Sequence, residues 1–227
     1  MPTDATASLV VAIDGPAASG KGTLAKRVAA ALDFAHLDTG ALYRAVGLVV
    51  NRRGGSPDDA DAAAEAARAL TPDAIAELVR DPALRGDEAA QAASKVSAVP
   101  DVRAALLDFQ RGFAARPPGG AAGAVLDGRD IGTVICPDAP AKLFVTATTE
   151  VRAERRLKEL RGRGVPAIYA AVLEDMKVRD TRDSQRAVSP LVPAGDAFLL
   201  DTSAMDADQA FDAAMAFIRS RPAFAGR

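Results

Sequence analysis

A glycine-rich loop between a short apolar run and a helical pattern constrains this chain more than any other feature. The loop reads GPAASGKGT over residues 15–23 and directly follows the apolar run Leu9–Ile13. In this context the spacing G-x4-G-K is typical of a loop whose backbone N–H groups surround a phosphate, with the lysine on the β- and γ-phosphates. The sequence therefore predicts a buried parallel strand, a phosphate-binding loop and a helix over Lys21–Leu32.

The rest of the chain alternates short apolar runs with helical segments, which predicts a parallel α/β sheet. Ser56-Pro57 and Thr71-Pro72 indicate helix starts, and Ser203–Asp206 fits a capping box. The 52 alanines favour helix wherever they cluster, so residues 51–93, with few large apolar groups, are interpreted as a thinly packed insertion. Further strands are predicted at Ala35–Leu37, Ala124–Leu126, Lys142–Thr146 and Ala197–Leu200, and further helices at Ala41–Val50, Pro100–Ala115, Glu150–Arg161 and Ile168–Arg182.

Composition excludes several classes of protein. The formal net charge is −2, from 28 basic and 30 acidic residues, so the chain as a whole has no electrostatic footprint for duplex nucleic acid. One cysteine, Cys136, and one histidine, His36, exclude a disulfide framework within the chain and a zinc site built from several such ligands. The first residues lack a basic segment, and Leu9–Ile13 is too short for a membrane span. We therefore expect a cytoplasmic protein, with a monomer as working hypothesis, and neither a membrane nor a nucleic acid polymer as partner.

Motifs beyond the loop make the pattern specific. Gly22 follows the lysine where many such loops carry Ser or Thr, and a hydroxyl comes one place later at Thr23. This G-K-G-T variant resembles nucleoside monophosphate (NMP) kinases more than GTPases or motor ATPases. The segments LDTGALYR (37–44), AASKV (92–96), DGRDIGT (127–133) and RDTRDSQR (179–186) then follow in the order found in bacterial cytidylate kinases, and PDAP (137–140) and PLVP (190–193) strengthen the likeness. The chain resembles that family from about residue 9 to residue 216.

The resemblance implies a fold and a division into parts. It implies the three-layer α/β fold of P-loop NTPases, with a five-stranded parallel sheet, a helical NMP-binding insertion and a short lid. The core would comprise residues 1–40, 104–149 and 165–227, the NMP-binding domain residues 41–103, and the lid residues 150–164. The family's insertion normally contains a small β-sheet element, whereas residues 51–93 here are Ala-rich and short, so the sequence leaves the shape of this part open.

The resemblance also implies a set of site residues. ATP contacts fall on Gly15, Pro16, Ala17, Ala18, Ser19, Gly20, Lys21, Gly22, Thr23 and Arg156. Contacts to CMP fall on Thr39, Arg44, Ser94, Arg103, Arg129, Asp130, Arg179, Asp183 and Arg186. The catalytic set is Lys21, Arg129, Arg152, Arg155 and Arg186, while Thr23 and Asp127 are candidate ligands, partly through water, of the Mg²⁺ that accompanies ATP.

The chemistry of these side chains agrees with a cytidine monophosphate. Cytosine offers an amine donor at N4, which suits a carboxylate such as Asp130 and a hydroxyl such as Ser94, and ring acceptors that suit Arg103. Planar guanidinium groups such as Arg44 suit the acceptor phosphate. That phosphate is mostly ionised at pH 7 and needs no strong general base, so the chemistry does not call for a catalytic histidine.

Taken singly, these residues also have structural interpretations. Arg179 and Asp183 have the spacing of an i,i+4 ion pair, and Asp127 at a strand end also suits helix capping. His36 lies in a predicted strand and is interpreted as structural, and Cys136 as a small buried hydrophobe.

The arginine-rich lid segment has two interpretations as well. Arg152, Arg155 and Arg156 lie within one helical turn and are expected to reach a common target over ATP, the alternative being a solvated face with interleaved acidic residues. The leading prediction is an enzyme that transfers the γ-phosphoryl group of MgATP to CMP or dCMP. The alternatives are a kinase for UMP or AMP and a non-catalytic nucleotide-binding protein.

Overall fold

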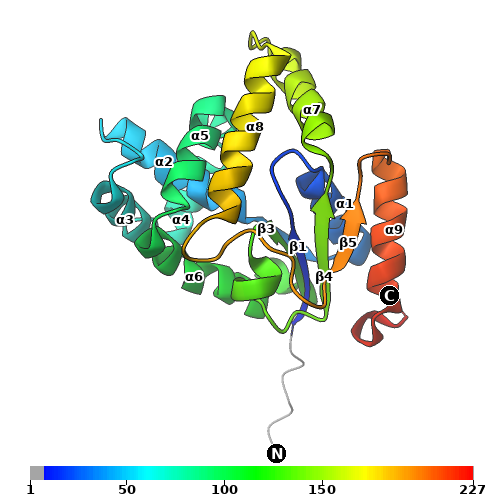
Figure 1. Cartoon of the computed structure of the whole chain (residues 1–227). Helices are drawn as coiled ribbons and strands as arrows, with labels where there is room; N and C mark the ends of the chain where they lie inside the picture. Colours follow the sequence, from blue (N-terminus) through cyan, green and yellow to red (C-terminus); the bar gives the residue numbers. More distant parts are fainter. Residues whose placement is uncertain (1–7, 227) are drawn as a thin grey trace, which may run out of the picture.

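The computed structural model describes residues 8–226 and contains a parallel sheet of five strands in the order β2-β3-β1-β4-β5. In the central strand, Val11 is in register with Val125 on one side and Ala141 on the other. Because the strands are parallel, their carboxyl ends meet at one edge, the upper edge in Figure 1. The strands are β1 (Leu9–Asp14), β2 (Ala35–Asp38), β3 (Gly123–Gly128), β4 (Ala141–Thr146) and β5 (Phe198–Asp201).

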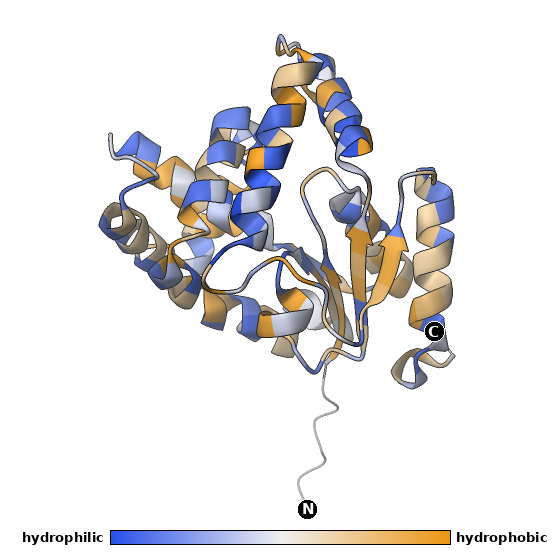
Figure 2. Cartoon of the chain, in the orientation of Figure 1, coloured by the Kyte–Doolittle hydropathy of each residue, from blue (hydrophilic) through white to orange (hydrophobic). Residues whose placement is uncertain are grey.

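The side chains of β1 alternate between two apolar layers. Val11 and Ile13 are buried under α1 (Lys21–Leu32) and α9 (Ala207–Ser220). On the other face, Val10 and Ala12 pack in the cluster that includes α6 (Pro100–Ala115) and a π-helical turn, η3 (Ile131–Ile135). Figure 2 shows hydrophobic strands in the sheet between helices in which hydrophilic and hydrophobic residues alternate. This three-layer arrangement confirms the expected α/β fold class.

All the secondary structure between β2 and α6 is helical. It comprises α2 (Thr39–Arg52), α3 (Ala60–Arg68), α4 (Pro72–Leu78), the 3-10 turn η1 (Pro82–Arg85) and α5 (Asp87–Val96), and its described residues form no strand.

Most of residues 51–93 are exposed, as expected for a thinly packed insertion, and most of the buried ones are alanines. Ala63 and Ala66 are fully buried in one cluster with Val46 of α2, because methyl side chains let helices approach closely. Helices α2 and α5 also approach closely, because a Cβ on Gly47 would come within 2.5 Å of the Ala92 Cβ. Small residues thus replace large apolar ones as the source of close packing.

The remaining helices are α7 (Thr149–Gly162) and α8 (Tyr169–Ser184), which rise above the carboxyl edge of the sheet in Figure 1, with the 3-10 turns η2 (Pro118–Gly120) and η4 (Pro222–Phe224). None of the described helices is long and apolar enough to cross a membrane.

Two of the predicted helix starts lie later in the chain than expected. Asp206, not Ser203, caps α9 and forms its capping box with Gln209, while Asp59 rather than Ser56 caps α3. In both places an aspartate nearer the helix competes successfully with the serine for the free N–H groups. The start at Thr71 is confirmed, since its hydroxyl accepts from the Ala74 N–H.

Candidate active site

The loop between β1 and α1 has a backbone that only glycine permits at its first position. A Cβ on Gly15 would lie 2.0 Å from the Val145 carbonyl oxygen of β4, and its φ is +150°. Gly20 at φ +89° and Ala18 at φ +58° also have left-handed backbones, which turn successive N–H groups toward one side. The loop is therefore held against the sheet by backbone contact.

The helix after this loop begins without a side-chain cap. Gly20 occupies the N-cap position of α1 and supplies no hydroxyl or carboxylate to the first free N–H groups. A helix N-terminus with uncapped donors is a binding site for a phosphate group. Lys21 is the first residue of this helix, and its amine donates weakly to the Pro16 carbonyl at 3.4 Å.

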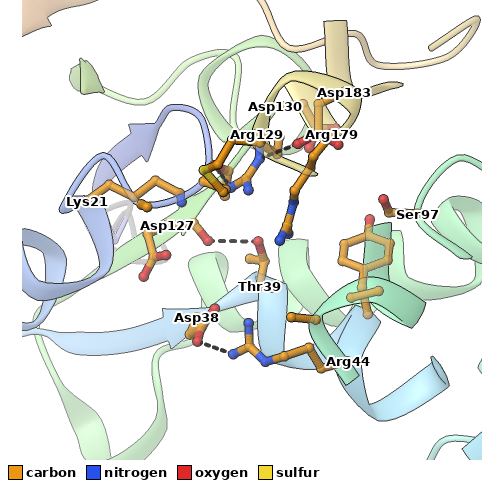
Figure 3. A pocket seen from close by; sticks show the side chains of 18 of the residues that line it. Lys21, Asp38, Thr39, Arg44, Ser97, Asp127, Arg129, Asp130, Arg179 and Asp183 are labelled. Carbon is orange, nitrogen blue, oxygen red and sulfur yellow. Dashed lines mark hydrogen bonds and ion pairs between the residues drawn. The ribbon is translucent and has the colours of Figure 1, made fainter. Parts of the chain in front are cut away.

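A cavity opens in front of this loop, between the sheet edge and helices α2, α5 and α8 (Figure 3). Its lining combines residues of the loop, acidic residues at the strand ends and basic residues of five helices. The residues that both line it and were predicted as site residues are Ala17, Ala18, Lys21, Thr39, Arg44, Arg103, Asp127, Arg129, Asp130, Arg156, Arg179, Asp183 and Arg186.

Other loop residues face a second cavity. Ser19, Gly20 and Thr23 line it together with Arg155, on the side of α1 that faces β4 and α9. Gly15, Pro16 and Gly22 line neither cavity and shape the loop through their backbone.

Cations in the main cavity crowd one another. Burial, followed by the nearby charge of Arg129, lowers the pKa of Lys21 to about 7. Burial and the same arginine lower the pKa of Arg179 to about 10, and the Nε of Arg179 has no hydrogen-bond partner among the described residues. Positive charges held together with unused donors indicate a site for a polyanion, which would relieve the repulsion.

Carboxylates hold the arginines of the main cavity in place. Arg129 donates from Nε to Asp183 at 2.9 Å, and Arg44 pairs with Asp38 at 2.6 Å (Figure 3). Burial alone would raise the pKa of Asp183, but Arg129 and the neighbouring arginines hold it below its usual range. The structure therefore pairs Asp183 with Arg129, and not with Arg179 as the i,i+4 interpretation had it.

The end of the cavity away from the loop is built to hold a polar ring. Arg103 pairs with Asp130, and both side chains are buried. The same guanidinium donates to the Ser97 carbonyl at 3.2 Å, and its Cζ lies 5.4 Å from the centre of the Tyr43 ring. A fixed carboxylate and a fixed cation beside an aromatic face are suited to reading the edge of a base.

Ser94 lies in a different place from the one expected. Its hydroxyl is buried and accepts from Arg182 at 2.8 Å, and it lines a neighbouring cavity between α5, α7 and α8. The main cavity is lined instead by Ser97, one turn further along the chain. Ser97, Tyr43 and Asp38 are lining residues that the sequence interpretation missed; the first lies three residues after Ser94, and the second four after Thr39.

Two of the three lid arginines of α7 contact the phosphate loop, since Arg152 donates to the Ala17 carbonyl at 3.4 Å and Arg155 to the Ser19 carbonyl at 3.3 Å. Arg152 is buried and forms a bidentate ion pair with Asp180 of α8, with N···O distances of 2.9 Å and 2.5 Å. Arg155 also donates to the carbonyl of Thr202, in the loop after β5, at 2.7 Å. Of the three arginines, only Arg156 lines the main cavity.

Asp127, at the end of β3, is the acidic side chain best placed for a metal ion beside the loop. Its Oδ1 lies 3.9 Å from the position of a Cβ on Gly22, and its backbone carbonyl accepts from Thr39 at 2.7 Å. Thr23, the other predicted ligand, lines the second cavity instead. Among the described residues no group of three His, Cys, Asp or Glu could hold an ion. This donor set fits Mg²⁺ that is carried mainly by phosphate oxygens and water.

Two further residues connect the cavity to the sheet. Asp14, at the end of β1, accepts from the N–H groups of Ile131 and Gly132, both at 2.8 Å, and so fixes the turn that follows Asp130. Burial raises the pKa of this carboxyl to about 7. Cys136, after the same turn, packs half-buried against the apolar layer beneath it, and burial raises the pKa of its thiol to about 11. No sequence motif singled out Asp14, because its partner lies 117 residues away.

A phosphate-binding loop on a parallel sheet, facing a cavity of paired arginines with a carboxylate at its far end, defines a phosphotransferase of the nucleotide kinase class. The comparisons with known proteins narrow this class. The family model for cytidylate kinase matches residues 11–220. The chain is 64% identical over 214 residues to a cytidylate kinase of Paramagnetospirillum magneticum, covering 94% of this chain and 99% of that one. It is 60% identical to a cytidylate kinase of Rhodospirillum rubrum, covering 91% and 95%. The chain belongs to the cytidylate kinase family.

Solved structures agree on the fold. An uncharacterized protein from Eubacterium ventriosum matches with a TM-score of 0.55 at 17% identity, covering 94% of this chain and 99% of that one. A sugar kinase from Janibacter matches with a TM-score of 0.50 at 16% identity, covering 97% and 99%. At these identities the likeness concerns the fold alone.

Proposed function

We propose that the chain transfers the γ-phosphoryl group of MgATP to CMP or dCMP, giving ADP and CDP or dCDP. The observation that carries the choice of base is the buried Arg103–Asp130 pair, which closes the end of the cavity opposite the phosphate loop. A carboxylate accepts from the cytosine amine, whereas uracil would turn an oxygen toward it. The family assignment supports the same base.

The proposed roles follow the two ends of the cavity. The loop amides and Lys21 hold the β- and γ-phosphates of ATP, while Arg44, Arg129 and Arg186 hold the phosphate of CMP. Arg179 lines the same cavity and has a buried, unpartnered Nε, which suits it to the phosphoryl group in transfer. Because the acceptor is already ionised, the residues have to position two polyanions and balance their charge.

The proposed Mg²⁺ would arrive with ATP, and Asp127 is the carboxylate that would face it beside the loop. When bound, the ion would neutralise charge on the β- and γ-phosphates. Thr23 is the weaker candidate because it faces the other cavity.

The proposed division into parts keeps residues 41–103 as the acceptor-binding part and 150–164 as the lid. It is supported by α2 and α5, which both line the cavity, and by Arg156 of α7, which reaches across to Asp87 of α5 at 2.5 Å. Arg152 and Arg155 then act by holding the lid helix to α8 and to the loop after β5. A monomeric state and a cytoplasmic location stay predictions.

Turnover with CMP, dCMP, UMP and AMP, each with MgATP, tests the proposal. The expected result is ADP formation with CMP and dCMP at a kcat/KM at least tenfold above UMP and AMP. Higher kcat/KM for UMP or AMP would favour the other monophosphate kinases. ATP binding without turnover of any of the four would favour a binding protein.

A further inference from the structure

The single histidine of the chain contacts the carboxylate proposed to face Mg²⁺. His36 lies on β2, two residues before Asp38, which is in register with Asp127 of β3. From this diagonal position its Nε2 lies 2.8 Å from the Asp127 Oδ2. A carboxylate can only accept, so the ring nitrogen is the donor. The contact is partly buried, with the side chains of His36 and Asp127 exposed by 18% and 6%.

The other oxygen of the Asp127 carboxylate, Oδ1, lies near Gly22 of the phosphate loop. Apart from the chain neighbours Lys21 and Thr23, the Asp127 Oδ1 is the only described side-chain atom within 4 Å of the position where a Cβ on Gly22 would stand. In phosphate-binding loops that carry Ser or Thr after the lysine, the hydroxyl at this position contacts Mg²⁺. This chain has glycine there, and a carboxylate oxygen comes near the space that the missing side chain would occupy.

We propose that His36 is a positioning residue that fixes the Asp127 carboxylate by one oxygen and so presents the other beside Gly22 to the Mg²⁺ of the bound nucleotide. The inference rests on the proposed function, because it takes the nucleotide to be a Mg²⁺ complex. His36 does not line the cavity and acts only through Asp127. Partners of this kind typically change metal affinity by about 10–100-fold when they are removed.

A purely structural role for the pair would connect β2 to β3, which already share four paired positions from Ala35 to Asp38. The two interpretations differ in what a substitute must supply. A structural role needs a side chain that fills the space, whereas positioning needs an N–H donor at the place of Nε2. Gln places its amide nitrogen the same number of bonds from Cα as His Nε2, Asn one bond fewer, and Leu has no donor.

The experiment measures Mn²⁺ binding to the protein–ADP complex by electron paramagnetic resonance for wild type, His36→Gln, His36→Asn and His36→Leu. We expect His36→Leu and His36→Asn to weaken Mn²⁺ binding about 10–100-fold, His36→Gln to stay within about threefold of wild type, and metal-free ADP binding to change little in all three. Wild-type Mn²⁺ affinity in His36→Leu overturns the proposal. So does an equal loss in all three variants.

A second readout needs no variant at His36. Because the chain has one histidine, its imidazole gives one set of NMR signals without further assignment. Mn²⁺ with ADP should broaden these signals strongly in wild type and weakly in Asp127→Asn, and unchanged signals in wild type would contradict the proposal. A wild type that binds ADP and Mn²⁺ but does not phosphorylate CMP would reject the proposed acceptor and leave the role of His36 standing. A wild type that does not bind ADP would reject the proposed function itself.

Discussion

The two ends of the active-site cavity are built by different means. At the end proposed to bind ATP (the donor end), Gly15 touches the backbone of β4 so closely that no side chain fits, and the first turn of α1 offers bare N–H groups. At the end proposed to bind the monophosphate (the acceptor end), side chains from distant segments meet in pairs, such as Arg103 with Asp130 and Arg129 with Asp183. The donor end is thus defined by backbone conformation and the acceptor end by charged side chains.

This difference separates what each end can recognise. Backbone amides and one lysine address phosphate groups and are indifferent to the base. A buried carboxylate beside a guanidinium has a fixed pattern of acceptors and donors and therefore distinguishes bases. We expect substitutions at the donor end to change the rate of transfer and those at the acceptor end to change the choice of monophosphate.

The largest effect is expected for Lys21→Ala. Removing the cation at the β- and γ-phosphates should lower kcat by about 10²–10³-fold or more while the fold is kept, because this side chain is not part of the apolar core. Steady-state kinetics with circular dichroism measure both. Lys26→Ala, an exposed lysine on the same helix, is the control and should keep its rate. A folded Lys21→Ala variant with wild-type kcat would remove the lysine from the mechanism.

The donor end was predictable from sequence because its signal is local. Strand, loop and helix start follow one another within residues 9–32, and Gly15 and Gly20 have positive φ angles. The acceptor residues came from the likeness to a family, since Arg103 and Asp130 are 27 positions apart and no spacing rule connects them. The packing of the Ala-rich helices and the directions of the lid arginines depend on tertiary contacts, which composition does not encode. Only the fold showed that His36 reaches Asp127.

A second effect is expected at Asp130. Asp130→Asn replaces one carboxylate oxygen by an amide that can donate to uracil O4. The ratio of kcat/KM for CMP over UMP should therefore fall about 10–100-fold. Competition assays with both monophosphates measure this ratio directly, and thermal unfolding checks that Arg103 without its charged partner still folds. A ratio equal to that of wild type would exclude Asp130 from reading the base.

A third effect concerns pH. The pKa of Lys21 is lowered to about 7 without ligand, and bound phosphates should raise it again, so ATP binding takes up a proton above pH 7. Below pH 7 the lysine is already charged and this contribution is constant. Above pH 7 the Kd for ATP should rise about tenfold per pH unit. Calorimetry at pH 8 in two buffers of different ionisation enthalpy measures the uptake. Lys21→Arg, which stays charged, should abolish it, whereas equal heats for wild type in both buffers would contradict the shifted pKa.

The smallest effect is expected for the ion pair that connects Asp87 of α5 to Arg156 of α7. Asp87→Asn removes the ion pair with Arg156 of α7, a partly exposed pair whose loss should raise the KM for both substrates about two- to fivefold. The effect should become smaller in 0.5 M salt, because ions at that concentration screen charges beyond a distance of about 4 Å. Glu88→Gln is the control on the same turn, because Glu88 bonds to Asn51 within the insertion. Equal effects of the two variants would mean that the contact with α7 contributes nothing.

The separation of the two ends is tested most directly by equilibrium binding of ATP, CMP and UMP to Lys21→Ala and Asp130→Asn, measured by calorimetry beside wild type. We predict that Lys21→Ala weakens ATP binding and keeps the preference for CMP over UMP, while Asp130→Asn keeps the ATP affinity and loses the preference. Loss of the base preference in Lys21→Ala, or a preserved preference in Asp130→Asn, would contradict the account.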